Sequence, residues 1–480
     1  MPINSFLYPG AKTTTAYEVA NSLRFNDGSS DNLTRTPSSA SNRKTWTWSG
    51  WVKRSTLGAN QDLFNAYNPD GFWERFYFTS GDILEYDNDI SGSDYTLNSE
   101  MLFRDVSAWY HLVFAKDTTQ STEANRLKIY VNGTQITLTE VALGYPPQNT
   151  DGDINNTLAH SIGKLASGSY FDGYMAEVVF VDGEALTPTS FGEFDEDSPT
   201  IWKPKSVSGL TFGTNGFYLD FEDSSALGAD VSGSSNSFTV NNLTAIDQST
   251  DTCTNNFATL NPLASSIDTS NNVLKEGNLQ VDHGDNNYDG GTATFGFLNN
   301  MTGKWYWEIR NNANTGSSNQ GEFAGISYIG DSSSTVYDDF GTESYLLATT
   351  GSNIIYKKDN SAVWTLTSPS GFSAGDIINV ALDLDNSKIW FGLNGTFYDM
   401  SDGSTDGDPT GSNGATVSRD YDYLPYFRIY GNTAQLDFNF GSPAFTISSG
   451  NADANGHGNF EYSVPTGYFA LNSKNLAEFG

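Results

Sequence analysis

Acidic side chains come closest to a catalytic pattern in this sequence. Retaining hydrolysis of a glycosidic bond needs two carboxyl groups about 5–5.5 Å apart that flank the bond. Glu177, Asp182 and Glu184 are the nearest approach to such a pair. The apolar run at 178–181 and the turn at Asp182-Gly183 separate them, so they cannot line one strand face. We therefore predict no catalytic residue and no enzymatic activity.

Histidine and cysteine add little further chemistry. The single cysteine, Cys253, excludes an intramolecular disulfide, and the sequence has no Cys/His spacing typical of a zinc site. His111 alternates with Val113 in a strand pattern, which favours a histidine inside a sheet over a catalytic base. Sequence motifs for a nucleophilic serine, a phosphate-binding loop or a dinucleotide fold are absent. The four histidines are His111, His160, His283 and His457.

One segment has oxygen-bearing side chains at a spacing that could hold a cation. Asp230, Ser232, Gly233 and Asn236 form the pattern D-x-S-G-x-x-N. Calcium needs about six to eight oxygens in a defined cage. Asp, Ser and Asn are equally the ordinary residues of hydrogen-bonded turns. We interpret the pattern as a turn, expect no cofactor, leave calcium open as the alternative, and assign no metal ligand.

Short strands and tight turns must position any site in this chain. The stretch 375–398 contains two runs, at 377–384 and 388–393, in which apolar residues recur at close to every second place. The pair Asn394-Gly395 follows, and it supplies the positive φ angles that a two-residue hairpin turn needs. The stretch therefore predicts three antiparallel strands in succession.

The composition extends this pattern to the whole chain. Its 480 residues exceed the size at which one core keeps growing, so two or three domains are expected. The chain has 31 Phe, 25 Tyr and 10 Trp, set among Gly, Asn, Ser, Thr and Asp. Aromatic residues between turn residues favour packed sheets over disorder. We predict an all-β fold that buries Trp46, Trp48, Val113, Ile129, Trp305, Trp307, Ile389 and Phe391.

The charge restricts the partners. A formal net charge of -33 argues against nucleic acid and anionic membrane surfaces, since phosphate groups call for clustered Lys and Arg. The sequence lacks a run of about 18 apolar residues, which a membrane helix would need. Residues 1–20 also lack the basic start and apolar stretch of a signal peptide. We therefore expect no membrane insertion, and either a cytosolic protein or one that is made in the cytoplasm of a host cell and released when that cell lyses.

Four motifs of the second half occur in an order and spacing that resemble the SPRY domain family. They are GKWYWEIR at 303–310, FAGIS at 323–327, the strand-rich stretch at 375–398, and LPYFRIYGNTAQLDFNFG at 424–441. The resemblance covers 272–446 and implies a β-sandwich whose rim loops bind peptides.

Three motifs of the first half resemble the laminin G-like, concanavalin A-type lectin fold. They are AWYHLVFAKD at 108–117, RLKIYVNGTQI at 126–136, and IGKLASGSYFDGYMAEVVFVDGEALTPTSF at 162–191. In the last motif, Gly173 and Glu177 match a glycine-anchored strand that carries an acidic residue. The resemblance covers 20–222 and implies another sandwich, of a family that binds glycans, often with calcium.

These two resemblances set the domain organisation. We predict two jelly-roll-like antiparallel β-sandwiches, at 21–222 and 272–446, joined by an extended and ordered linker at 223–271. An N-terminal arm at 1–20 precedes them, and a packed C-terminal tail at 447–480 follows.

Loops of the second sandwich place aromatic residues among acids and amides. A ring face stacks on the C–H patches of a sugar while polar neighbours bind its hydroxyls. We expect Tyr337, Phe340, Tyr421 and Tyr423 to bind a ligand, with the alternative that each tyrosine only lines the core.

The combination of motifs also resembles structural proteins of tailed bacteriophages. The opening SLRFND…LTRTP…KTWTWSGWVKR and the segment NNFATLNPL carry this resemblance. It implies a non-enzymatic component of the virion surface, such as a tail fibre, spike or decoration protein, that contacts other virion proteins and host-surface glycans. The alternative is a bacterial glycan-binding adhesin or carbohydrate-binding module, and the third interpretation is a concanavalin-type glycoside hydrolase.

Shallow sugar sites bind weakly, and display in several copies raises apparent affinity by about 10²–10⁴. We therefore expect a homo-oligomer, most simply a trimer, or a multicopy array of monomers on one particle. The polar arm at 1–20 is the expected anchor to the particle, with Phe6, Leu7 and Tyr8 as its buried contacts.

Overall fold

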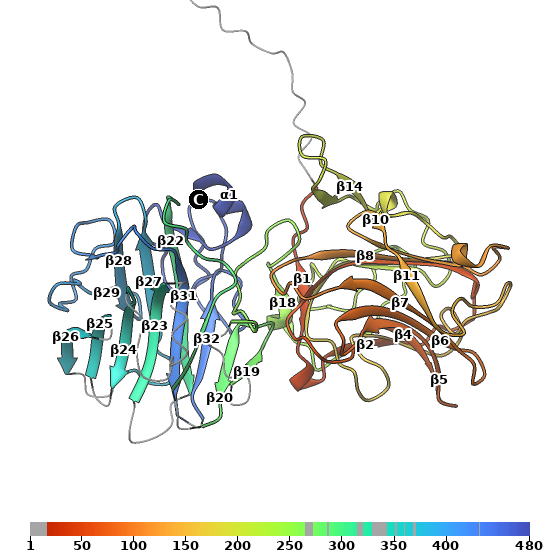
Figure 1. Ribbon diagram of the computed structural model, residues 1–480, viewed down its shortest axis with the longest axis horizontal. Coiled ribbons are helices and arrows are strands. Elements are labelled where there is room, and N and C mark those ends of the chain that lie inside the picture. Colours follow the sequence, from red (N-terminus) through yellow and green to blue (C-terminus); the bar gives the residue numbers. More distant parts are fainter. Residues whose placement is uncertain are drawn as a thin grey trace, which may run out of the picture.

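The computed structural model describes residues 17–264, 272–285, 288–313, 320–328, 343–350, 353–359, 361–367, 371–431 and 433–480. These residues form two β-sandwiches that lie beside each other, the first in red to yellow and the second in green to blue (Figure 1). Almost all strand pairs are antiparallel, and the helices are short. The predicted all-β fold class is confirmed.

The first sandwich packs two sheets, A and B, of eight strands each. Sheet A contains, in spatial order, β10 (Thr134–Gln135), β9 (Leu127–Val131), β8 (Tyr110–Asp117), β3 (Thr45–Arg54), β13 (Gly173–Asp182), β1 (Ser22–Phe25) and β18 (Gln248–Ser249), with β16 (Phe217–Leu219) beside β13. Sheet B contains β11 (Leu138–Ala142), β7 (Asp94–Leu102), β6 (Ile83–Asp89), β5 (Phe72–Phe78), β4 (Gln61–Asn68), β12 (Ala159–Ile162), β2 (Asn32–Arg35) and β17 (Thr239–Asn241).

Alternating side chains fill the space between sheets A and B. On β3, Trp46 and Trp48 point into this core, where the ring of Trp48 packs edge-on against Phe76 of β5. Single-turn 3₁₀ helices and one small hairpin connect the strands of the sandwich: η1 (Asp27–Ser29), η2 (Glu123–Asn125), η3 (Pro188–Ser190), η4 (Ala245–Asp247), β14 (Gly192–Phe194) and β15 (Trp202–Pro204).

The second sandwich packs a sheet of nine strands, C, against a sheet of six, D. Sheet C contains β19 (Asn272–Lys275), β20 (Gln280–His283), β32 (Gln435–Asn439), β22 (Lys304–Ala313), β27 (Ile377–Asp383), β28 (Lys388–Leu393) and β29 (Thr396–Phe397), with β30 (Ala415–Thr416) beside β28 and β33 (Phe469–Ala470) beside β22. Sheet D contains β21 (Tyr288–Thr292), β31 (Tyr423–Tyr430), β23 (Gln320–Tyr328), β24 (Tyr345–Thr350), β25 (Asn353–Lys358) and β26 (Ser361–Thr367).

The predicted three-strand stretch is confirmed as β27, β28 and β29. Asn394 and Gly395 have φ angles of 50° and 79°, as a two-residue hairpin turn requires. All eight side chains predicted to be buried are inaccessible to solvent.

The segment between the two cores departs from the predicted linker at 223–271. Two of its strands complete the first sandwich, because β17 pairs with β2 and β18 pairs with β1. Phe257 and Leu260 enter the core of the second sandwich. The predicted boundary at 222 is therefore wrong, because it excludes β17 and β18 from the first sandwich. These two strands pair with β2 and β1, which lie about 200 residues earlier in the sequence.

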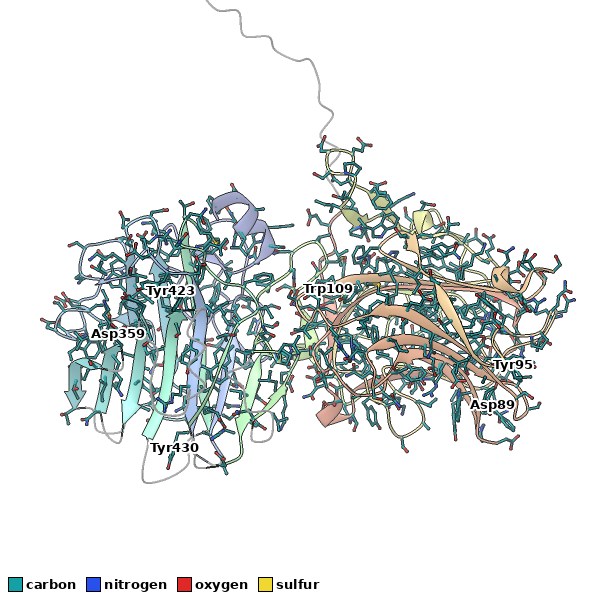
Figure 2. The ribbon with its side chains drawn as sticks, viewed as in Figure 1. Asp89, Tyr95, Trp109, Asp359, Tyr423 and Tyr430 are labelled. Atoms are coloured by element: carbon teal, nitrogen blue, oxygen red, sulfur yellow. The ribbon has the colours of Figure 1, made fainter. Side chains whose placement is uncertain are left out.

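Polar contacts join the two sandwiches along one junction. Lys53 of β3 reaches Asp251 and Asn256 in the connecting segment, each at 2.8 Å. Arg24 of β1 pairs with Glu276, 3.2 Å away, just after β19. Trp109, labelled in Figure 2, donates its indole N–H to Asp251 at the same junction. The sandwiches are thus held together by side chains that are mostly buried.

The C-terminal tail packs against the second sandwich. Phe460, Tyr468 and Leu471 are buried in its core, and β33 runs parallel to β22. The chain ends in α1 (Ser473–Phe479), which the Asn472 side chain caps by accepting from the Asn475 backbone N–H. In the described part of the chain, no helix combines the length and the apolar character of a membrane span.

Candidate functional site

Two of the four predicted ligand-binding residues, Tyr337 and Phe340, lie outside the described residues, as do the predicted anchor residues Phe6, Leu7 and Tyr8. The described part of the second sandwich brings Tyr421 near Tyr328, with ring centroids 4.9 Å apart, and leaves it half-buried.

Tyr423 does not fit its predicted role in ligand binding. It is 1% exposed, and Figure 2 shows it within the second sandwich. Its ring packs edge-on against Tyr345, 6.1 Å away between centroids. As the first residue of β31, it takes the inward side of the alternating strand, so its ring fills the core.

Two of the three acidic residues considered for catalysis, Glu177 and Asp182, are held in structural contacts. Glu177 lies at a β-bulge in β13, where its φ angle is 51°. Tyr17 and Tyr218 both donate their hydroxyls to its carboxylate at 2.8 Å. Burial raises the pKa of Glu177 to about 7. Asp182 accepts from the backbone N–H of Asn215 at 3.0 Å, while the Glu184 side chain is exposed.

The Asp230 segment forms the predicted turn. One carboxylate oxygen of Asp230 accepts from the backbone N–H groups of Tyr218 and Ser232, both at 2.9 Å. The other oxygen accepts from the backbone N–H of Asn236 at 2.7 Å. Both oxygens therefore face N–H donors, an arrangement that does not fit a calcium cage.

A cluster of charged and aromatic side chains lies elsewhere, on the outer face of sheet B. We call it the Arg75 cluster, and its members are Asp62, Trp73, Arg75, Tyr77, Glu85 and Asp87. Strands β4, β5 and β6, which supply them, lie at the lower right in Figure 1.

Strand register creates this cluster. Asp87 of β6 pairs with Arg75 of β5, and Glu85 pairs with Tyr77. Successive residues of a strand face opposite sides. Phe76, between Arg75 and Tyr77, lies in the core between the sheets. The members of the Arg75 cluster therefore point outward, away from sheet A.

Arg75 is fixed by two carboxylates and two rings. Its Nη1 lies 3.3 Å from Asp62 Oδ2, and its Nε lies 3.3 Å from Asp87 Oδ2. The guanidinium carbon is 3.8 Å from the centroid of the Tyr77 ring and 5.2 Å from that of Trp73. A cation in this position is attracted by the ring faces as well as by the carboxylates.

The aromatic members are themselves hydrogen-bonded to acids. Trp73 donates its indole N–H to Asp87 Oδ2 at 2.6 Å, and Tyr77 donates its hydroxyl to Glu85. These bonds set the ring orientations, so a ligand would meet a surface whose side chains already have fixed positions.

Burial dominates the electrostatics of the acidic members. It raises the pKa of Asp62 to about 7, although the nearby Arg75 guanidinium acts in the opposite direction. Burial also raises the pKa values of Asp87 and Glu85, the latter despite the hydrogen bond from Tyr77. The cluster combines three carboxyl groups with one guanidinium.

The members differ in accessibility, which separates their roles. Asp62 is inaccessible to solvent and serves to hold Arg75. Trp73 and Glu85 are half-buried, as is Tyr67, which pairs with Trp73 across β4 and β5. The reachable members are therefore the Trp73 ring at one end of the cluster and Glu85, opposite Tyr77, at the other end, and both kinds of group occur in sugar recognition.

Sequence reasoning missed the Arg75 cluster. The one local signal was the alternation of Trp73, Arg75 and Tyr77 along a single strand. The acids come from neighbouring strands, so their proximity depends on pairings that residue spacing does not encode.

One family model matches part of the first sandwich. Residues 27–190 match the family described as the concanavalin A-like lectin/glucanases superfamily. No curated protein sequence is significantly similar to the chain.

Several solved structures are similar at low identity. A native heptameric SAP-like pentraxin from Limulus polyphemus is 16% identical, with 36% of this chain and 80% of that chain covered and a TM-score of 0.27. The SPRY domain of human HERC1 is 19% identical, with coverages of 35% and 91% and a TM-score of 0.23. Domains LG4-5 of the mouse laminin alpha1 chain are 10% identical, with coverages of 96% and 91% and a TM-score of 0.29. Each of these likenesses is distant.

The fold and the family match define the class of the protein. It is an antiparallel β-protein of two sandwiches. Its first sandwich matches, over residues 27–190, the model of the concanavalin A-like lectin/glucanases superfamily, and the same residues carry the Arg75 cluster.

Proposed function

We propose that the first sandwich binds a glycan at the Arg75 cluster without cleaving it. The observation that carries the proposal is the half-buried Trp73 ring, held by its hydrogen bond to Asp87 beside an Arg75 guanidinium that two carboxylates fix. The match of 27–190 to a superfamily of lectins and glucanases supports the same class of ligand.

The cluster suits a neutral glycan better than an anionic one. Its three carboxyl groups outnumber its one guanidinium, and the whole chain carries a net charge of -33. A sulfated or carboxylated sugar would meet like charge. A neutral oligosaccharide can stack the C–H face of one sugar ring on Trp73 and donate a hydroxyl of another sugar to Glu85.

The contacts of the acids support binding rather than hydrolysis. Asp62 and Asp87 share one guanidinium, and Glu85 accepts from the Tyr77 hydroxyl. A nucleophilic carboxylate needs an open approach to the sugar ring, and Asp62 is fully buried.

The test is binding of neutral oligosaccharides to the purified chain, measured by a glycan array and then by calorimetry. Trp73→Ala should weaken binding by about tenfold, equivalent to about 1.4 kcal/mol of lost contact energy. Tyr130→Ala is the matched control, since it removes a half-buried ring from β9 in sheet A. Equal affinity in Trp73→Ala and the wild type would refute the site. Release of reducing ends would favour hydrolysis instead.

We also propose that the chain is displayed in several copies on a phage particle, as a trimer or as an array of monomers. The resemblance of the opening SLRFND…LTRTP…KTWTWSGWVKR and of NNFATLNPL to virion structural proteins supports this role. Multiple copies would offset the weak binding expected of a shallow site.

The anchoring role of the N-terminal arm has its own test. The last residues of the arm belong to the fold, since Tyr17 donates to Glu177 and the Val19 backbone N–H donates to Thr254. Deletion of 2–16 spares these contacts. It should leave the melting temperature unchanged and prevent incorporation into particles. Normal incorporation of this truncated chain would refute the anchor.

A further inference from the structure

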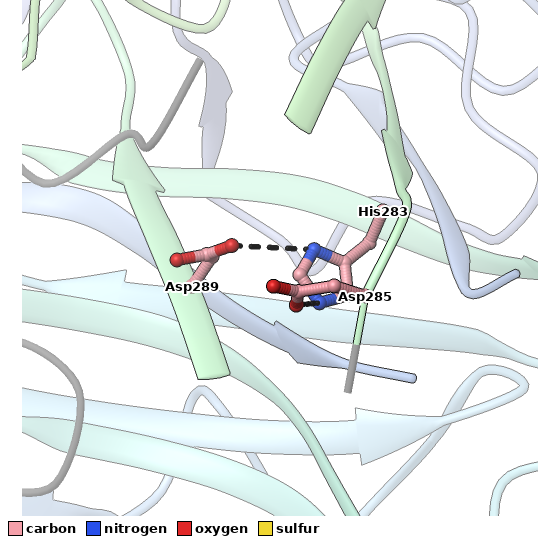
Figure 3. Close-up of side chains that lie close together, drawn as sticks. All are labelled: His283, Asp285 and Asp289. Carbon is pink, nitrogen blue, oxygen red and sulfur yellow. Dashed lines mark ion pairs between the residues drawn. The ribbon is translucent and has the colours of Figure 1, made fainter. Parts of the chain in front are cut away.

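We propose that the second sandwich has a binding site for a first-row divalent metal ion, made by His283, Asp285, Asp289 and Asn272. Figure 3 shows the two carboxylates beside the imidazole of His283, each paired with a different ring nitrogen. The site lies apart from the Arg75 cluster, which belongs to the other sandwich.

Both sheets of the second sandwich contribute to this site. Asn272 and His283 face each other across β19 and β20 of sheet C. Asp289 comes from β21 of sheet D. An ion held by these side chains would connect the two sheets at one edge of the sandwich, where β19 and β21 are the outermost strands.

The spacing of the ligand atoms suits a small ion. An ion with bonds of about 2.0–2.2 Å holds neighbouring ligands about 3.0–3.5 Å apart. His283 Nδ1 lies 3.4 Å from Asp289 Oδ2 and 2.9 Å from Asn272 Oδ1. The Asp289 and Asn272 oxygens therefore each lie at nearly the distance from His283 Nδ1 that separates neighbouring ligands on one ion.

Asp285 would serve as the fourth ligand from the solvent side. Its Oδ1 lies 3.1 Å from His283 Nε2, on the other edge of the ring. The ligand atoms of His283, Asp285 and Asp289 lie within 4.8 Å of one another. Because Asp285 faces the other ring nitrogen, it would reach an ion on Nδ1 by turning its side chain or through a bridging water molecule.

The burial and the charge of the cluster both suit a bound divalent cation. His283, Asp289 and Asn272 are at most 4% exposed, whereas the Asp285 side chain is 24% exposed and leaves a route from solvent. Two carboxylates supply the negative charge that offsets a divalent cation.

The ligand types decide the class of ion. An imidazole nitrogen suits zinc, copper, iron and nickel, while calcium and magnesium take oxygen ligands almost exclusively. One imidazole with carboxylate and amide oxygens therefore favours Zn²⁺ or a similar transition ion over Ca²⁺.

The experiment is calorimetric titration of the chelator-treated full chain with ZnCl₂ and, separately, with CaCl₂, together with melting curves. We expect one Zn²⁺ per chain, a higher melting temperature with Zn²⁺, and at least tenfold weaker binding of Ca²⁺. His283→Gln and Asp289→Asn should each weaken Zn²⁺ binding at least tenfold. His457→Gln is the matched control, since His457 belongs to the same sandwich but lies outside the site, and it should bind as the wild type does.

Asp285→Asn allows the site to be tested even if the substitutions of buried residues impair folding. It alters only the most accessible ligand, so the variant should fold and bind Zn²⁺ more weakly. Co²⁺ offers a second readout, because its visible absorption should change when a ligand is lost. Absence of stoichiometric Zn²⁺ binding to the wild type would overturn the site. Unchanged affinity in His283→Gln and Asp285→Asn, or tighter binding of Ca²⁺ than of Zn²⁺, would do the same.

Discussion

Replacing Lys53 by methionine should weaken the junction between the two sandwiches. The Lys53 side chain is 1% exposed, and its Nζ donates to Asp251 Oδ2 and Asn256 Oδ1 at 2.8 Å and to the Phe257 carbonyl at 3.2 Å. Methionine fills similar volume without a charge, so the variant isolates the polar interactions.

The magnitude follows from what remains around Asp251. Removing one partner of a buried ion pair costs about 3–5 kcal/mol, because the other charge stays buried. Asp251 would keep hydrogen bonds from the Trp109 indole at 3.2 Å and from the Phe257 backbone N–H at 3.3 Å. We therefore expect a loss near the lower end, about 3 kcal/mol in the free energy of unfolding.

Two further variants separate the ion pair from general damage. The double variant Lys53→Met/Asp251→Asn removes both charges and should recover about 1–2 kcal/mol relative to the single variant. Lys44→Met is the matched control: its pair with Asp151 spans 3.9 Å, and the side chains are 38% and 53% exposed. An exposed pair of this kind contributes less than about 1 kcal/mol.

The assay is equilibrium urea unfolding of the full chain followed by tryptophan fluorescence, with limited proteolysis of 250–257 as the local readout. Lys53→Met should lower the unfolding midpoint and speed cleavage in this segment. A loss no larger than that of Lys44→Met would refute the reasoning, as would a double variant no more stable than the single one.

Two further predictions concern β13. Burial raises the pKa of Glu177 from 4.5 to about 7. Between these pH values the folded chain keeps a proton that the unfolded chain releases. The contribution of Glu177 to the free energy of unfolding therefore falls as pH rises from about 4.5 to 7. Glu177→Gln should abolish this fall, so the variant should be about 3 kcal/mol more stable than the wild type at pH 8. Urea unfolding at pH 5 and pH 8 measures the difference. A variant that is less stable than the wild type at pH 8 would contradict this. Gly173→Ala should lower the melting temperature, since φ is 147° and an added Cβ would lie 2.2 Å from the Lys53 carbonyl oxygen; an unchanged melting temperature would show that the backbone adapts.

The sequence alone determined the features that depend on neighbouring residues. Alternation of apolar and polar residues along 377–384 and 388–393, ended by Asn394-Gly395, predicts β27 to β29, because side-chain period and turn chemistry are local properties. The burial of Trp46 and Trp305 followed in the same way, since a large ring in an alternating strand is most stable inside a core.

Only the tertiary structure decided where the candidate sites lie. Trp73 and Arg75 become a candidate site because the pairing of β4, β5 and β6 brings Asp62 and Asp87 to the same guanidinium. Tyr423 looked like a loop residue in the sequence, yet the register of β31 turns it into the core. Strand pairing joins residues that are far apart in the sequence, and a shift of register by one residue would move every side chain of a strand to the other face of the sheet. The positions of the candidate sites are therefore set by the packing of whole sheets.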